Sequence, residues 1–221
     1  MSEPRVPRPA GASRYGWFVG VVMVLAVVYV TLNGIRTESP GARGLDPGEG
    51  LPPFAVPLVL SDLEGDANVA TGAGQGEAGG RPACGVRGPE ILNICQLAER
   101  GPVVLAFLAT RGGDCANTID SLRGIAGRHP GVQVAVVAIR GDRGELRDLV
   151  RSRGWDFPVG HDRDGVLANF YGVSVCPQIT YARWRGRAQS TSFGKIGARE
   201  LDRRVEQAVA ASRRTGWERP R

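Results

Sequence analysis

The sequence has few of the residues and spacings on which common catalytic and binding sites depend. Its 221 residues include only two histidines. They contain no glycine-rich phosphate loop, no zinc-ligand spacing and no Ser-His-Asp arrangement. No internal repeat is visible. We therefore expect no cofactor and no metal site, and the four cysteines become the main candidates for chemistry.

Positive charge is in excess, but its distribution does not indicate nucleic-acid binding. The net charge is +6, from 28 basic and 22 acidic residues. The arginines are scattered among acidic residues, and no patch combines basic with aromatic side chains. Attraction to anionic lipid headgroups explains the charge equally well. We expect no nucleic-acid partner.

Charged residues are absent from 15–35, and this run predicts a membrane anchor. As a helix it would extend about 31 Å, close to the thickness of a bilayer's hydrocarbon core. Arg5, Arg8 and Arg14 precede the run, so the positive-inside rule places residues 1–14 in the cytoplasm and the remainder of the chain outside. A cleaved signal peptide is the disfavoured alternative, because no cleavage-site pattern follows the run.

Beyond this anchor, residues 36–50 are rich in glycine and proline and predict a flexible linker. Continuous apolar runs at 102–109 and 132–139 predict buried strands, with helical periodicity between them and after them. The pattern predicts an α/β sandwich with a mixed central sheet. We place this domain at 51–212, with an inserted loop at 66–90 and a basic C-terminal tail at 213–221. Shorter strands are expected at 54–60 and 91–95, and a hairpin at 178–193.

Residues 103–115 (VVLAFLATRGGDC) carry a family resemblance. They resemble the strand-to-helix junction of membrane-anchored thiol–disulfide oxidoreductases of the thioredoxin superfamily, a group that includes redoxin and alkyl hydroperoxide reductase-type domains. That family's pattern is A-T-W-C-x-x-C. Here Ala109 and Thr110 match, Arg111 replaces the tryptophan, Gly112 replaces the first cysteine, and Cys115 keeps the second. The C-x-x-C motif is therefore degenerate.

A second stretch, residues 161–181 (HDRDGVLANFYGVSVCPQITY), resembles the family's aspartate-rich turn, short helix and cis-proline segment. The resemblance implies a thioredoxin-like sandwich in which Pro177 is cis and its loop faces the start of the active-site helix. Cys176 would then lie beside Cys115 and replace the missing partner. Pro177, Thr110 and Arg111 would line the substrate groove. Cys115 is expected to be the nucleophile, because a helix start favours the thiolate.

The remaining cysteines, Cys84 and Cys95, are separated by ten residues. A structural disulfide between them is one interpretation, and a second redox pair that relays electrons to Cys115 is the other.

Three functions stay open on this sequence. The first is thiol–disulfide exchange through Cys115 and Cys176 with a thiol or disulfide partner protein outside the cytoplasm. The second is a redox-inactive thioredoxin-fold module that binds a partner, and the third is a peroxiredoxin-like peroxide reductase. A copper carrier would need a cysteine pair and a histidine, for which His161 is the candidate.

Overall fold

The computed structural model describes residues 12–36, 43–65, 81–109 and 115–219, and in the first of these ranges it describes side chains only for 15–30. The chain divides into two compact units: the first ends at Ser39 and the second begins at Pro40. Each unit is described by itself below.

The first unit contains one helix, α1 (Ala12–Arg36). Its large apolar side chains between Trp17 and Val30 are exposed. Within the described part of the chain, no helix combines the length and hydropathy of a membrane span. The predicted segment at 15–35 is therefore helical, and its prediction as a transmembrane anchor is not confirmed.

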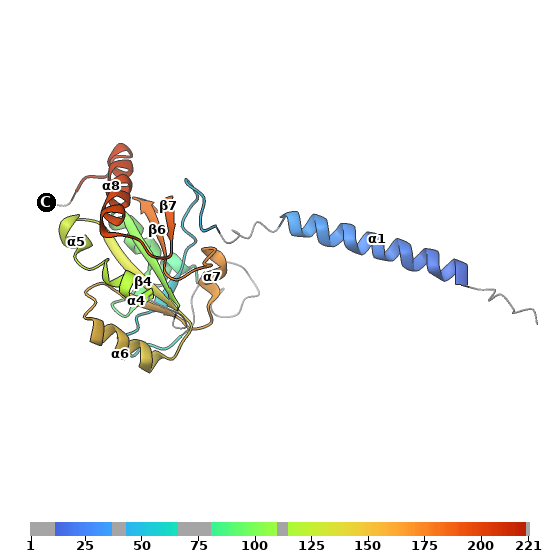
Figure 1. Cartoon of the computed structure of the whole chain (residues 1–221), viewed down its shortest axis with the longest axis horizontal. Coiled ribbons are helices and arrows are strands. Elements are labelled where there is room, and N and C mark those ends of the chain that lie inside the picture. The colour runs from blue at the N-terminus through green and yellow to red at the C-terminus, as the bar shows by residue number, and fades with distance from the viewer. Residues whose placement is uncertain (1–11, 37–42, 66–80, 110–114, 220–221) are drawn as a thin grey trace, which may run out of the picture. The chain divides into compact units, whose positions relative to one another are not determined.

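The second unit is built on a five-stranded mixed sheet with the strand order β5-β4-β3-β6-β7 (Figure 1). The central strand β3 runs parallel to β4 and antiparallel to β6, so the sheet is mixed, as predicted. The strands are β3 (Val103–Ala109), β4 (Gln133–Ile139), β5 (Val159–Asp162), β6 (Gln178–Arg183) and β7 (Arg187–Phe193).

Both faces of this sheet are covered, which explains the continuous apolar sequence of β3 and β4. Alternate residues of β3 belong to two separate clusters: Val104, Ala106 and Leu108 to one, Val103, Leu105 and Phe107 to the other. Helices α4 (Cys115–Asp120), α5 (Ile125–Arg128), α6 (Arg143–Arg153) and α8 (Ala198–Arg214) contribute to the first cluster. Helices α3 (Ile94–Arg100) and α7 (Val166–Phe170) contribute to the second.

Two short strands form a separate antiparallel pair, β1 (Ala55–Pro57) with β2 (Ile91–Asn93). Both are shorter than the predicted strands at 54–60 and 91–95. Strand β2 ends at Asn93 because the side chain of this residue caps α3, accepting a hydrogen bond from the backbone N–H of Gln96. Cys95 therefore lies on a helix, and the sequence reading missed both α3 and β5.

The predicted linker at 36–50 is too long at its C-terminal end. Leu45 is buried, the N–H of Gly48 donates to the carbonyl of Ala188, and Gly50 bridges to Arg187. Strand β7 lies at the edge of the sheet, so its outer backbone groups are available for these bonds. This stretch of chain is part of the second unit.

The predicted tail at 213–221 also begins too early. Helix α8 continues to Arg214, and Trp217 beyond it is only 5% exposed. The indole Nε1 of Trp217 donates to the carbonyl of Arg100 at 3.3 Å. Of the inserted loop predicted at 66–90, residues 66–80 lie outside the described part of the chain, and the remainder includes a 3-10 turn, η1 (Ala83–Gly85).

Candidate functional site

A disulfide joins Cys115 to Cys176, the pair that the resemblance implied. Cys115 is the first residue of α4, and Cys176 lies two residues before β6. Their Cα atoms are 5.4 Å apart although 61 positions separate them in sequence. The peptide bond between Cys176 and Pro177 is cis, as expected.

The end of the sheet positions the sulfur of Cys176. Pairing between β3 and β6 stops at Phe107 with Gln178. The backbone N–H of Ala109, two residues further along β3, therefore has no carbonyl group of β6 opposite it. This N–H points at Sγ of Cys176 at a distance of 3.0 Å. The sulfur thus takes the place of a backbone acceptor at the end of the ladder. The sequence could not predict this contact, because every residue except proline has a backbone N–H and the residue type does not show where it points.

Hydrogen bonds within the fold hold the loop that carries Cys176. The buried side chain of Gln178 donates through Nε2 to the carbonyl of Tyr171 at 2.8 Å and accepts from the N–H of Ser174 at 3.4 Å. On the other side, the N–H of Gly194 donates to the carbonyl of Pro177 at 2.8 Å. Hydrogen bonds therefore fix the loop on both sides of Cys176.

The two sulfurs of this disulfide differ in their surroundings. Cys115 is 3% exposed and belongs to the cluster that includes Leu108 and Ile119. Cys176 is half-buried. Two apolar side chains near it in the fold are exposed: Val175, its neighbour in sequence, at 42%, and Phe193, opposite Gln178 on β7, at 43%. The Cys176 side of the disulfide is therefore the more exposed to solvent.

Two predicted groove residues, Thr110 and Arg111, lie outside the described part of the chain. Their roles stay predictions. A cavity of about 530 Å³ opens beside the last described residue of β3, at the carboxyl ends of the parallel strands. That position is where ligands bind in many open α/β sheets. Its lining includes Ala109, Ile139, Arg140, Gly141, Gly165, Ala168 and Asn169.

The second disulfide joins Cys84 to Cys95 and so ties η1 to α3. Arg87 reinforces the same connection: its guanidinium donates to both carboxylate oxygens of Glu99, at 2.8 and 2.5 Å, and its Nε donates to the carbonyl of Cys84. The guanidinium accordingly holds the pKa of Glu99 below its usual value. These contacts favour the structural interpretation of this disulfide.

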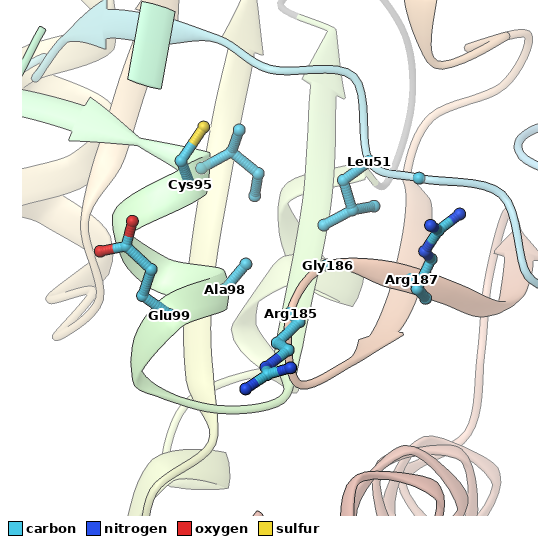
Figure 2. Close-up of a pocket in the computed structure, with 9 residues that line it drawn as sticks. Leu51, Cys95, Ala98, Glu99, Arg185, Gly186 and Arg187 are labelled. Carbon is cyan, nitrogen blue, oxygen red and sulfur yellow. The ribbon is translucent and has the colours of Figure 1, made fainter. Parts of the chain in front are cut away.

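Cys95 also lines a cavity of about 440 Å³ (Figure 2). Figure 2 shows Cys95, Ala98 and Glu99 on α3, across the cavity from Arg185 and Gly186 of the β6–β7 turn and from Arg187 at the start of β7. Cys176 precedes the opposite end of β6. The two disulfides therefore lie toward opposite ends of this strand, which disfavours a direct relay between them.

His161 is buried on β5, opposite Ala138 of β4. Its Nε2 has no hydrogen-bond partner among the described residues, and burial lowers the pKa of the ring. The neighbouring Asp162 is buried as well and accepts hydrogen bonds from the N–H groups of Gly165, Val166 and Leu167. Over the ranges that the structure describes, no group of three or more histidine, cysteine or acidic side chains is arranged to hold a metal ion. The copper-carrier alternative gains no support.

No family model and no curated protein matches this chain. Solved structures do match it. A candidate thiol:disulfide interchange protein DsbE from Chlorobium tepidum is 18% identical, with a TM-score of 0.57 over 75% of this chain and 99% of its own. A candidate protein disulfide isomerase from Bacteroides thetaiotaomicron is 12% identical, with a TM-score of 0.57 over 78% and 97%. A DsbF homologue from Corynebacterium diphtheriae is 14% identical, with a TM-score of 0.54 over 74% and 90%.

These likenesses define the class of the domain. A mixed sheet covered by helices on both faces, a cis-proline before β6 and the matched structures together show a thioredoxin-like fold. At these identities the likeness shows the fold alone.

Proposed function

We propose that this protein is a thiol–disulfide oxidoreductase whose reactive pair is Cys115 with Cys176. The observation that carries the proposal is the disulfide between the start of α4 and the cis-proline loop, in which Cys176 is half-buried. A bond in this position can accept two electrons from a dithiol partner or, once reduced, donate them to a partner disulfide. The partner is a thiol or disulfide protein outside the cytoplasm.

Exchange proceeds in two balanced steps. A partner thiolate attacks one sulfur of the Cys115–Cys176 bond, and the other sulfur leaves as a thiolate that takes up a proton. A second thiolate of the partner then attacks the partner sulfur of the mixed disulfide. The partner's own disulfide forms, and the second cysteine of this protein leaves as a thiolate that takes up a proton. The partner is oxidised by two electrons and this protein is reduced by two. The reverse sequence reduces a partner.

The test is a redox titration of the full-length chain. Samples are equilibrated in glutathione or dithiothreitol buffers of defined potential, the thiols are trapped, and each cysteine is scored by mass spectrometry. We expect the Cys115–Cys176 bond to open between about −120 and −270 mV, the range of thioredoxin-fold oxidoreductases. A bond that stays closed below about −300 mV is structural and overturns the proposal. A variant with Cys84→Ala and Cys95→Ala serves as the control that assigns the transition.

A second proposal concerns location: the domain lies outside the cytoplasm and is tied to the membrane by the N-terminal segment. Two disulfides within the described residues support an oxidising compartment. The charge-free run at 15–35 supports the anchor. We expect the chain to stay with carbonate-washed membranes and to be digested by protease added to intact spheroplasts. Release by carbonate contradicts the anchor, and protection from protease contradicts the orientation.

The redox-inactive binding module is the second candidate, and one observation favours it. Val175 and Phe193 expose apolar surface beside the cis-proline loop, where a partner segment could bind without any exchange. In that case the titration finds no opening in the stated range, while a partner still binds the oxidised protein. Nothing in the described residues favours the peroxide reductase, because Thr110 lies outside them and both site cysteines are bonded to each other.

A further inference from the structure

We propose that Cys176, in the cis-proline loop, is the sulfur that exchanges with substrate, and that Cys115 is the buried resolving sulfur. This inference rests on the proposed function and specifies which of the two cysteines reacts with the substrate. It reverses the expectation from the sequence, in which Cys115 at the helix start is the nucleophile. It also differs from the arrangement that the resemblance implies, in which the attacking cysteine lies at the position of Gly112.

Access is the first argument. Attack on a disulfide requires the incoming sulfur to approach in line with the S–S bond, so the attacked sulfur must be reachable from outside. Cys115 is 3% exposed among apolar side chains, whereas Cys176 is half-buried and follows two exposed residues, Ser174 and Val175. Cys176 is therefore the more accessible residue of the pair, and we infer that an incoming protein thiolate attacks its sulfur.

Hydrogen bonding is the second argument, and it is independent of access. The N–H of Ala109 lies 3.0 Å from Sγ of Cys176. The carbonyl oxygens of Ala109 and Phe107 lie farther from the same sulfur, at 3.7 and 4.0 Å. Because the nearest backbone group is a donor, the surroundings favour Cys176 as an attacking thiolate in the reduced protein. The contact with the N–H of Ala109 also keeps Sγ of Cys176 in place after Cys115 departs. The apolar surroundings of Cys115 instead favour its neutral thiol.

These two features set the order of the reaction. In the reducing direction, the Cys176 thiolate attacks a substrate disulfide, one substrate sulfur leaves as a thiolate and is protonated, and a Cys176–substrate disulfide forms. The Cys115 thiol then loses its proton to solvent or buffer and attacks Sγ of Cys176. The second substrate sulfur leaves, and the Cys115–Cys176 bond forms again. The covalent intermediate is carried by the loop.

The surface around Cys176 indicates the class of substrate. Val175 and Phe193 are exposed at 42% and 43% beside the loop, so a cysteine flanked by apolar residues in an extended polypeptide buries these side chains when it reaches Cys176. A small polar disulfide such as glutathione makes little of this contact. We therefore assign the site to polypeptide cysteines with apolar neighbours.

The test compares variants of the full-length chain that keep one cysteine of the pair, in a background with Cys84→Ala and Cys95→Ala. Cys115→Ser and Cys176→Ser are reduced, mixed with oxidised glutathione, quenched with acid and measured by mass spectrometry. We expect the Cys115→Ser protein to form its adduct, at Cys176, at least ten times faster than the Cys176→Ser protein forms one at Cys115. Equal rates or the opposite order overturn the assignment and leave the proposed function intact. A wild-type bond that does not open in the titration overturns the function itself.

A measurement on the wild-type chain covers the case in which a variant fails to fold. The reduced protein is treated briefly with iodoacetamide, and peptide mapping shows which of Cys115 and Cys176 is alkylated first. We expect Cys176, and first labelling of Cys115 contradicts the assignment.

The substrate class is tested with Val175→Asp and Phe193→Asp. We expect each to slow exchange with an oxidised peptide that has leucine beside its cysteine by at least five-fold, with less than two-fold change for glutathione. Leu60→Asp is the control, because Leu60 is 51% exposed and belongs to a different loop. An equal effect on both substrates contradicts the assignment of the apolar surface.

Discussion

Cys115 and Cys176 are 61 positions apart in sequence, and their disulfide closes a loop that contains the two strands between α4 and β6. The segment between them includes α5, β4, α6, β5 and α7, and so two of the five strands of the sheet. Cys84 and Cys95 close a loop with a separation of only 11. The two bonds thus constrain the unfolded chain to different extents.

This difference predicts an order of stability. In the chain-entropy model, removing the Cys115–Cys176 bond lowers the free energy of unfolding by about 4 kcal/mol, and removing the Cys84–Cys95 bond lowers it by about 3 kcal/mol. The comparison uses Cys115→Ala with Cys176→Ala against Cys84→Ala with Cys95→Ala, in urea unfolding followed by tryptophan fluorescence. Disulfide exchange should vanish only in the first variant. A larger loss of stability in the second contradicts the loop-length argument.

His161 predicts a pH dependence of stability. Burial lowers the pKa of His161 in the folded state, so the unfolded chain, with a pKa near 6.5, binds the proton more tightly. The contribution to stability is complete above the unfolded pKa and is lost as the pH falls from about 6.5 toward the folded pKa, by at most about 1.4 kcal/mol per pH unit.

The measurement is the free energy of unfolding at several pH values between 7.5 and 5.5 for wild type and His161→Gln. We expect the wild type to lose more stability over this interval than the variant. Asp162 acts with the opposite sign, because burial raises the pKa of its carboxyl group, but it is present in both proteins and its effect cancels. Identical pH profiles contradict the prediction.

The close approach of Gly101 to the chain at Gly131 predicts that a single added methyl group lowers the stability of the domain. A Cβ at this position would lie 2.1 Å from the carbonyl oxygen of Gly131, a backbone atom that cannot rotate away. We expect Gly101→Ala to lower the free energy of unfolding by about 1–3 kcal/mol or more, as overpacking does. Gly127→Ala is the matched control: nothing lies within 4 Å of its Cβ, and it sits in α5. An alanine there should stabilise by roughly 0.5–1 kcal/mol.

The burial of Trp217 indicates that the chain beyond α8 contributes to the stability of the domain. The side chain is 5% exposed, belongs to the cluster under α8 and donates to the carbonyl of Arg100. We expect Trp217→Ala to lower the free energy of unfolding by about 3–5 kcal/mol. Arg219→Ala, two residues further at an exposed position, should change it by less than about 0.5 kcal/mol. Chemical denaturation of both variants decides the point, and equal effects would be inconsistent with a packed Trp217.

Most of the sheet was predictable because its strands have a strong local signal. The apolar runs at 102–109 and 132–139 correspond to β3 and β4, and the hairpin across Arg185 and Gly186 forms as expected. Strand β5 was missed because its four residues include His161 and Asp162, whose burial depends on contacts with distant segments. Helix α3 was missed because its start depends on the cap formed by Asn93.

The sequence by itself determined the α/β class with a mixed sheet, the even set of four cysteines and the absence of a complete C-x-x-C motif, since these follow from local pattern and residue identity. Only the tertiary structure decided which cysteine of the site is the more exposed and which backbone amide faces its sulfur. It also decided that Leu45 and Trp217 belong to the domain. Exposure and hydrogen bonding depend on groups far apart in the chain, and no local pattern encodes them.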